Sequence, residues 1–397
     1  MAGRRRTPGS AVVAVCLLLV SLVACGGRTA TDGARADAQR LLDRRAAALL
    51  AHDAGAYART GAGAAFERVR AVPLADWSYR VTGTHRTGDA LAVDADLSYR
   101  VRGHDRAPVT VPRALRLARD AGGRWAVAEE RPAPKAGQQL WDQGTVTVVR
   151  GRHSLVMGVG QSGERLRSFA DLADRAVPAV SAVWGTDWAG QVVLLVPTSL
   201  EGMAGLLGSP ASSYRGIAAV TTGETGGPPR APADRIVVNP DAYRTLGPIG
   251  RQVVITHETT HVATRAHTNG ATPLWLSEGY ADWVGYRDTD RGPAEAAPEL
   301  ARAMAEGRAP DALPTDEDFG FGGDATRLAQ AYEGGWMACR VIAERWGEER
   351  LHAFYRAVGA HGKREGAVEG ALRDVLGTTL RDFTADWQDY LRARLAG

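Results

Sequence analysis

The feature that most constrains the fold is the pattern of histidine and glutamate in residues 253–286, which requires two neighbouring helices to share one site. His257, Glu258 and His261 form an HExxH motif, and Glu278 follows within a second predicted helix. Residues four apart lie on one face of a helix, so both imidazoles of the motif can point at one ion. Two imidazoles, one carboxylate and one position left for water are typical of a catalytic zinc site rather than a structural one.

The residues around the motif favour a buried site. Apolar residues precede His257, and two buried histidines without a metal or a partner would be costly. Asp282 lies four residues after Glu278, on the same helix face, where its carboxylate can accept the Nδ1–H of a ligand histidine and select its tautomer. The alternative is a surface helix that carries two unrelated histidines.

The segments HETTH and PLWLSEGYADWVG resemble the gluzincin zinc metallopeptidases, in particular the peptidase MA-like domains of the thermolysin-like clan. The resemblance implies that His257, His261 and Glu278 bind Zn2+. It also implies that Glu258 is the general base and that Asp282 is the acid that supports a ligand histidine. The expected substrate is a peptide or a protein.

A rival third ligand is His267, which occupies the third-histidine position of the metzincin pattern. That pattern needs glycine where this chain has Thr264, because the chain must turn sharply out of the helix there. A β-branched residue is poorly suited to positive φ. We therefore expect the helix to continue to about Arg265, with His267 at its C-terminal end, where a histidine interacts favourably with the helix dipole.

The resemblance further implies that a tyrosine or histidine from the C-terminal helices stabilises the oxyanion of the reaction. Tyr332, in the sequence AYEGG, matches the position at which related peptidases carry such a tyrosine. The alternative is a tyrosine packed in the core. Tyr280 and Tyr286 are weaker candidates for the same role.

The N-terminal residues 1–24 resemble the signal peptide of a bacterial lipoprotein. Three arginines precede an apolar run that is too short to span a membrane, and the sequence LVAC ends at Cys25. The resemblance implies that Cys25 carries the lipid, palmitate or a similar acyl chain, and that residues 25–33 form a polar tether. We then expect a protein anchored on the outer face of the cell membrane. The alternative is an ordinary secretory signal cleaved near Ala24.

Charge and cysteine content limit the partners. The chain has a net charge of +3, and residues 1–24 contribute three arginines and no acid, so the remainder is close to neutral (3 − 3 = 0). Near-neutral charge argues against nucleic acid as a partner. After removal of Cys16 and lipidation of Cys25, only Cys339 remains, so no internal disulfide can form. We expect a monomer.

The periodicity predicts an α+β protein of two domains. In residues 34–131 a helix precedes several alternating strands, a pattern that resembles the SnoaL-like cone. Prolines in residues 131–135 mark the boundary.

Residues 140–397 are expected to form the zincin-like domain, with a mixed sheet followed by C-terminal helices. Strands are predicted over 144–150, 191–197 and 235–239, and a helix over 163–184. The resemblance implies that the strand at 235–239 is a sheet edge that pairs with extended substrate. The alternative is an ordinary core strand.

The sequence thus predicts a lipid-anchored extracytoplasmic zinc metallopeptidase. The alternatives are an inactive peptidase-like lipoprotein that binds or senses a ligand, and a zinc hydrolase that cleaves an amide of the cell wall. The intact Glu258 favours an enzyme, because a scaffold that needs only zinc does not require that base.

Overall fold

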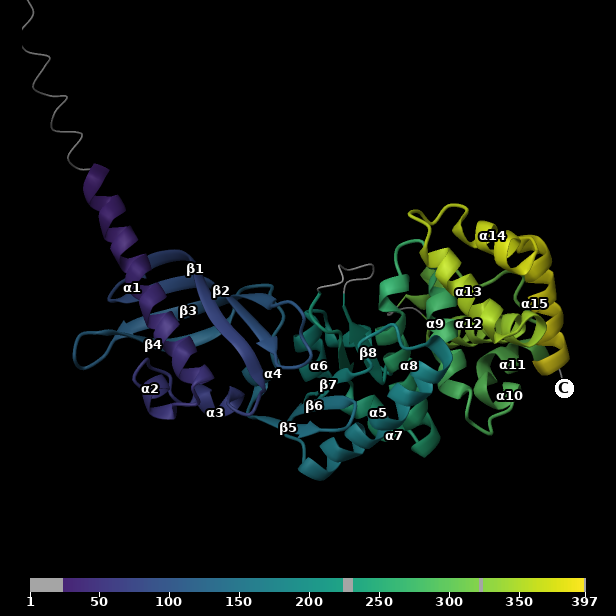
Figure 1. Ribbon diagram of the computed structural model, residues 1–397, viewed down its shortest axis with the longest axis horizontal. Helices are drawn as coiled ribbons and strands as arrows, with labels where there is room; N and C mark the ends of the chain where they lie inside the picture. The colour runs from purple at the N-terminus through teal and green to yellow at the C-terminus, as the bar shows by residue number, and fades with distance from the viewer. Residues whose placement is uncertain (1–23, 224–230, 321–323, 396–397) are drawn as a thin grey trace, which may run out of the picture. The chain divides into compact units, whose positions relative to one another are not determined.

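The computed structural model describes residues 24–223, 231–320 and 324–395, with side chains from residue 33 onward (Figure 1). The expected signal segment lies outside these residues except for Ala24, and the side chain of Cys25 is not described. The chain is a mixed α+β protein with two sheets, divided into two compact units whose main boundary lies between Ala136 and Gly137. No helix of the described part is both long and apolar enough to cross a bilayer.

The first unit consists of a long helix packed on a four-stranded sheet with the order β1-β2-β3-β4. The alternating pattern of β2 buries every second side chain, from Leu91 to Val101. Against this sheet α1 packs with the buried Leu41, Leu42 and Leu49. The elements are α1 (Ala24–Leu50), α2 (Ala54–Ala58), α3 (Ala65–Val69), β1 (Leu74–Thr87), β2 (Ala90–Val101), β3 (Val109–Arg119) and β4 (Trp125–Pro132).

The expected tether at residues 25–33 differs from the structure, in which these residues have helical backbone. They continue α1 from its packed part, and no proline interrupts the segment.

The second unit contains a mixed sheet with the order β5-β6-β7-β9-β8, in which β6, β7 and β9 run parallel and the two edge strands run antiparallel. Its central strands are continuous apolar runs because both faces are covered. The sheet is formed by β5 (Val146–Arg150), β6 (Ser154–Val159), β7 (Val192–Val196), β8 (Ala219–Thr222) and β9 (Arg235–Val238). Around it lie α4 (Leu140–Gln143), α5 (Gly163–Trp184), α6 (Leu200–Leu207), α7 (Pro240–Thr245) and α8 (Pro248–Thr264).

Of the two alternatives for residues 235–239, the structure shows the core strand and contradicts the sheet edge that the resemblance implied. The strand there, β9, lies between β7 and β8, and Ile236 and Val238 are fully buried. The edge is β8, which has only four residues and no long apolar run. Its position depends on pairing with β9, a non-local contact that the sequence pattern does not reveal.

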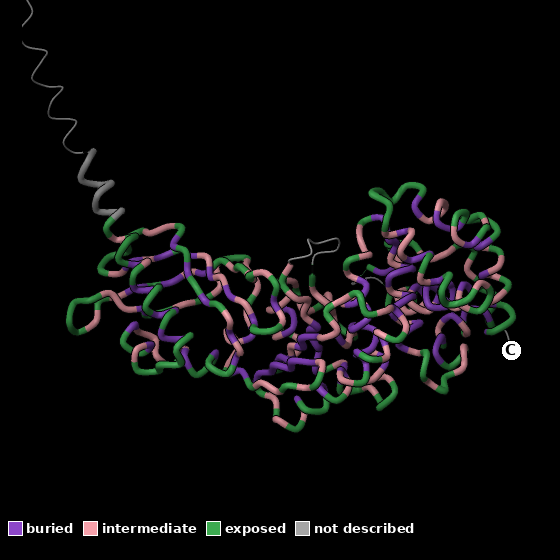
Figure 2. Tube along the Cα trace, viewed as in Figure 1, coloured by how far each residue is buried: buried purple, intermediate pink, exposed green. Residues whose placement is uncertain are grey.

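Helices α9 (Leu274–Tyr286) and α12 (Ala325–Trp346) cross in close contact in the helical half of this unit. A Cβ atom added at Gly279 would lie 2.2 Å from the backbone of Gly335, so only glycine permits this approach. The surrounding core includes Trp275, Tyr280 and Trp387, all buried. Figure 2 shows buried segments inside this helical half and exposed segments around its outside.

The remaining helices are α10 (Pro293–Ala296), α11 (Pro298–Ala305), α13 (Glu348–Gly359), α14 (Ala367–Ala371) and α15 (Leu380–Leu395), with short 3-10 turns at Ala211–Tyr214, Arg265–His267 and Asp316–Phe319 and a π turn at Leu372–Leu376.

Candidate functional site

Helix α8 positions both histidines of the motif. It starts with Pro248, whose fixed φ suits the first helical position. The intervening Thr259 and Thr260 are buried, and their hydroxyls donate to carbonyl oxygens four residues back, at 2.7 and 2.8 Å. The unbroken helix brings the Nε2 atoms of His257 and His261 to 3.0 Å from each other.

Helix α9 supplies the carboxylate. Oε2 of Glu278 lies 3.2 Å from Nε2 of His257 and 3.2 Å from Nε2 of His261. Three potential ligand atoms from two helices therefore form a nearly equilateral triangle. All of them lie within 4.8 Å of one another, and this is the only such group of three among the described residues.

The triangle has the dimensions that a tetrahedral Zn2+ site requires. Metal–ligand bonds of about 2.0–2.1 Å and tetrahedral angles separate neighbouring ligand atoms by about 3.3 Å. The observed separations of 3.0–3.2 Å are close to that value. Two imidazole nitrogens and one carboxylate oxygen are also a donor set that zinc accepts.

Asp282 orients the first histidine. Its Oδ1 lies 2.7 Å from Nδ1 of His257, one helical turn beyond Glu278. With Nδ1–H donated to Asp282, Nε2 of His257 presents its lone pair to the triangle.

The charges of the cluster shift the pKa values of its members. Burial opposes protonation of His257, but the carboxylates of Asp282 and Glu278 outweigh it and raise the pKa of this imidazole well above its usual value. Burial likewise disfavours ionisation of Glu278, yet the charges and hydrogen bonds of His261 and His257 lower the pKa of this carboxyl. The site therefore attracts positive charge, from protons or from a cation.

The carboxylate of Glu258 contacts the edge strand β8 and lines the same cavities as His257. The hydroxyl of Thr221 on β8 lies 2.5 Å from Oε2 of Glu258 and 3.2 Å from its carbonyl oxygen. This contact orients the carboxylate of the motif. Sequence reasoning missed Thr221, since nothing in the chain marks a residue so far before the motif as a neighbour of Glu258.

Tyr332 on α12 lies above the first histidine, with ring centroids 6.4 Å apart, and its ring packs against Phe319 at 5.1 Å. Burial and the nearby carboxylates, led by Glu278, raise the pKa of Tyr332 well above its usual value, so its hydroxyl keeps its proton. By contrast, Tyr280 is fully buried beside Trp184.

His267 lies outside the triangle. Its Nε2 is 2.9 Å from Nη1 of Arg356, which donates to it, and its ring meets the edge of Trp184. Close to the expectation, α8 ends at Thr264 with Arg265 as its cap in helical conformation, and His267 ends the following 3-10 turn. The structure therefore brings Glu278, and not His267, to the two histidines of the motif.

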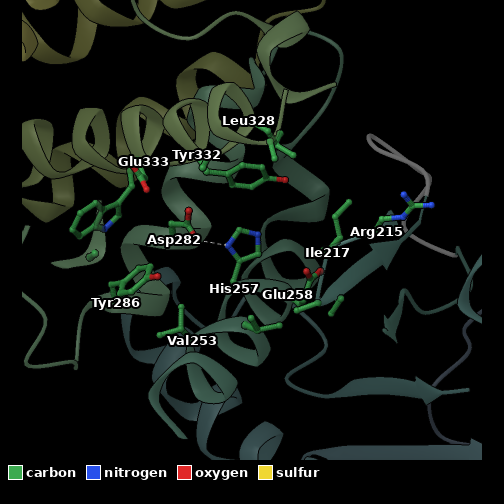
Figure 3. Close-up of a pocket in the computed structure, with 18 residues that line it drawn as sticks. Arg215, Ile217, Val253, His257, Glu258, Asp282, Tyr286, Leu328, Tyr332 and Glu333 are labelled. Carbon is green, nitrogen blue, oxygen red and sulfur yellow. Dashed lines mark hydrogen bonds and ion pairs between the residues drawn. The ribbon is translucent and has the colours of Figure 1, made fainter. Parts of the chain in front are cut away.

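Two cavities flank the site and share His257, Glu258 and Tyr332. The first, of about 450 Å3, extends between α8 and α12 (Figure 3). The second, of about 410 Å3, extends toward the start of α9. Ala219 of β8 lines both, so a groove follows this edge strand past the triangle.

A scan of the chain against protein-family models finds no match, and neither does a search of curated proteins.

Proposed function

We propose that this chain is a zinc metallopeptidase of the gluzincin type that hydrolyses peptide bonds. The observation that carries the proposal is the triangle of His257, His261 and Glu278, with the carboxylate of Glu258, outside the triangle, lining the same cavities. A purely structural metal site would need a fourth protein ligand. Here the three donors border cavities that are large enough for a peptide segment.

Each side chain of the site has a distinct role in this proposal. When bound, Zn2+ would supply a Lewis acid that acidifies a water molecule and polarises a carbonyl group. Glu258, held by Thr221, accepts the proton of the attacking water and passes it to the leaving amine. The protonated hydroxyl of Tyr332 donates a hydrogen bond to the oxygen on which negative charge develops. Asp282 keeps His257 in the tautomer that binds metal.

The edge strand β8 supports an extended substrate. It pairs with β9 on one side only, and no strand pairs with its other edge among the described residues. A peptide added at that edge would gain backbone hydrogen bonds that do not depend on its side chains. The groove along β8 would carry this peptide past Glu258 and Tyr332.

The cellular setting follows from the N-terminal sequence. We propose a lipoprotein signal at residues 1–24, acylation of Cys25 and a location on the outer face of the cell membrane. Under this proposal residues 34–131 form a SnoaL-like domain, the protein is a monomer, and nucleic acid is not a partner.

Metal content and peptide hydrolysis test the proposal together. The purified protein should contain about one zinc per chain, and His257→Ala should lose it while the control His267→Ala keeps it. Glu258→Gln should retain zinc and lose hydrolysis. Full metal content in His257→Ala would end the metal assignment. Full activity in Glu258→Gln would end the role of Glu258, and zinc without hydrolysis in the wild type would favour a binding or sensing lipoprotein.

Tyr332→Phe provides a separate test of the oxyanion donor. Removal of one such donor typically lowers kcat about 100- to 1000-fold, and zinc content should not change. An unchanged kcat would make Tyr332 a packing residue.

A further inference from the structure

The first cavity has a carboxylate at one end. Glu333 follows Tyr332 on α12 and lines this cavity (Figure 3). In this view Glu333 and Tyr286 lie at one end, and Arg215 and Ile217 lie at the other, with His257 between them. The cavity therefore passes the first histidine of the triangle and has an acidic end on the side of α12.

No basic side chain neutralises Glu333 within the described residues. Its two carboxylate oxygens accept backbone N–H groups at the start of α11, from Glu299 at 3.2 Å and from Leu300 at 2.6 Å. It forms no ion pair with arginine or lysine in the described part of the chain. Asp282 lies nearby and adds negative charge. A half-buried carboxylate without a cationic partner is stabilised when a ligand brings a positive charge to it.

The walls of the first cavity are largely apolar. They are formed by Val253, Val254, Ala296, Leu328, Ala329 and Trp336. A side chain with a long aliphatic stem and a cationic end matches this combination, since the stem contacts the walls and the charge reaches the carboxylate. An acidic side chain would meet Glu333 and Asp282 at close range and be rejected.

The direction of β8 indicates which residue of the substrate places its side chain in the first cavity. The first cavity is lined by residues from Arg215 to Ala219, and the second by residues from Ile217 to Thr221. The first cavity thus lies toward the start of the edge strand. A peptide that pairs antiparallel to β8 runs from the second cavity to the first. The residue after the cleaved bond then places its side chain in the first cavity.

We propose that this cavity selects lysine or arginine at the residue that follows the scissile bond, with Glu333 as the specificity-determining side chain. The inference rests on the proposed peptidase function and narrows its substrates to peptides with a basic residue at that position. Because Glu333 also caps α11, the test must separate specificity from stability.

The test uses zinc-loaded protein and one peptide series. The peptides differ only at the residue after the cleaved bond, which is lysine, arginine, norleucine or glutamate, and mass spectrometry locates the cleavage. We expect kcat/KM for lysine and arginine to exceed that for norleucine about 10- to 100-fold, the usual range for a charge-assisted hydrogen bond. Glu333→Gln should remove this preference and keep hydrolysis of the norleucine peptide.

The control is Glu306→Gln, which removes an exposed carboxylate near the end of α11 and should leave the preference unchanged. Equal kcat/KM for lysine and norleucine in the wild-type protein would overturn the inference without any variant. An unchanged preference in Glu333→Gln would overturn it as well.

Binding to the Glu258→Gln variant, measured by fluorescence anisotropy with the same labelled peptides, separates the two proposals. Tighter binding of the lysine peptide than of norleucine supports the cavity assignment even if the wild type hydrolyses neither. Hydrolysis without any basic preference refutes the cavity assignment alone. If the protein neither binds nor hydrolyses these peptides, both the peptidase proposal and the cavity assignment are refuted.

Discussion

Replacing Asp282 by asparagine removes the negative charge of the group that orients His257 and keeps an oxygen that can accept the same hydrogen bond. The amide keeps an oxygen at the position of Oδ1, which accepts from Nδ1 at 2.7 Å, so the ring can stay in place. What disappears is the negative charge that makes the imidazole a better donor to a metal. Both partners are mostly shielded from solvent, with side chains 11% and 16% exposed, so the charge is only weakly screened.

Loss of such a partner typically weakens metal binding 10- to 100-fold, which corresponds to about 1.4–2.7 kcal/mol. Competition with a chromophoric chelator at fixed pH measures the zinc affinity directly. The melting temperature with a fixed excess of zinc should also fall, since weaker binding contributes less to the folded state.

The control for Asp282→Asn is Asp288→Asn, which changes the same charge at an exposed position just beyond α9. It should bind zinc as the wild type does. If Asp282→Asn binds zinc within twofold of the wild type, the hydrogen bond to His257 does not support a metal ligand. The assignment of the triangle would then lose its main electrostatic argument.

Three further perturbations test the surroundings of the site. Thr221→Val removes the hydroxyl 2.5 Å from Glu258, so kcat should fall about 10-fold with zinc content unchanged, as steady-state kinetics would show. Gly335→Ala places a Cβ 2.5 Å from a carbonyl oxygen of α9 and should cost about 1–3 kcal/mol by chemical denaturation. The control Gly250→Ala, whose new Cβ meets only a side chain at 3.5 Å, should be neutral or stabilising. Burial raises the pKa of Glu333 to about 7 from 4.5, so folding favours the protonated carboxyl. The contribution of this group to the free energy of unfolding is therefore complete below pH 4.5 and is lost as the pH rises through 7. Between pH 4.5 and 7, the melting temperature of Glu333→Gln should therefore rise relative to that of the wild type. A difference in melting temperature that stays constant over this range would contradict the raised pKa of Glu333.

The sequence by itself determined the local geometry of the candidate site. The spacing of four between His257 and His261 places both rings on one helix face. The β-branched Thr264 argued against the positive-φ turn that would bring His267 to the same site, and Thr264 is helical in the structure. Several strands were also visible, because their hydrophobic periodicity arises within a few neighbouring residues, but β6 and β8 of the second sheet were not predicted.

Only the tertiary structure decided what lies around those histidines. Thr221 reaches Glu258 because β8 pairs with β9, and Gly335 lets α12 approach α9 so that Tyr332 lies over the site. Glu333 faces a cavity only because α8, α9 and α12 pack together. These contacts join residues far apart in the chain, and their free energy comes from packing and pairing across elements. A local pattern of residue types therefore does not predict which distant residues will be in contact.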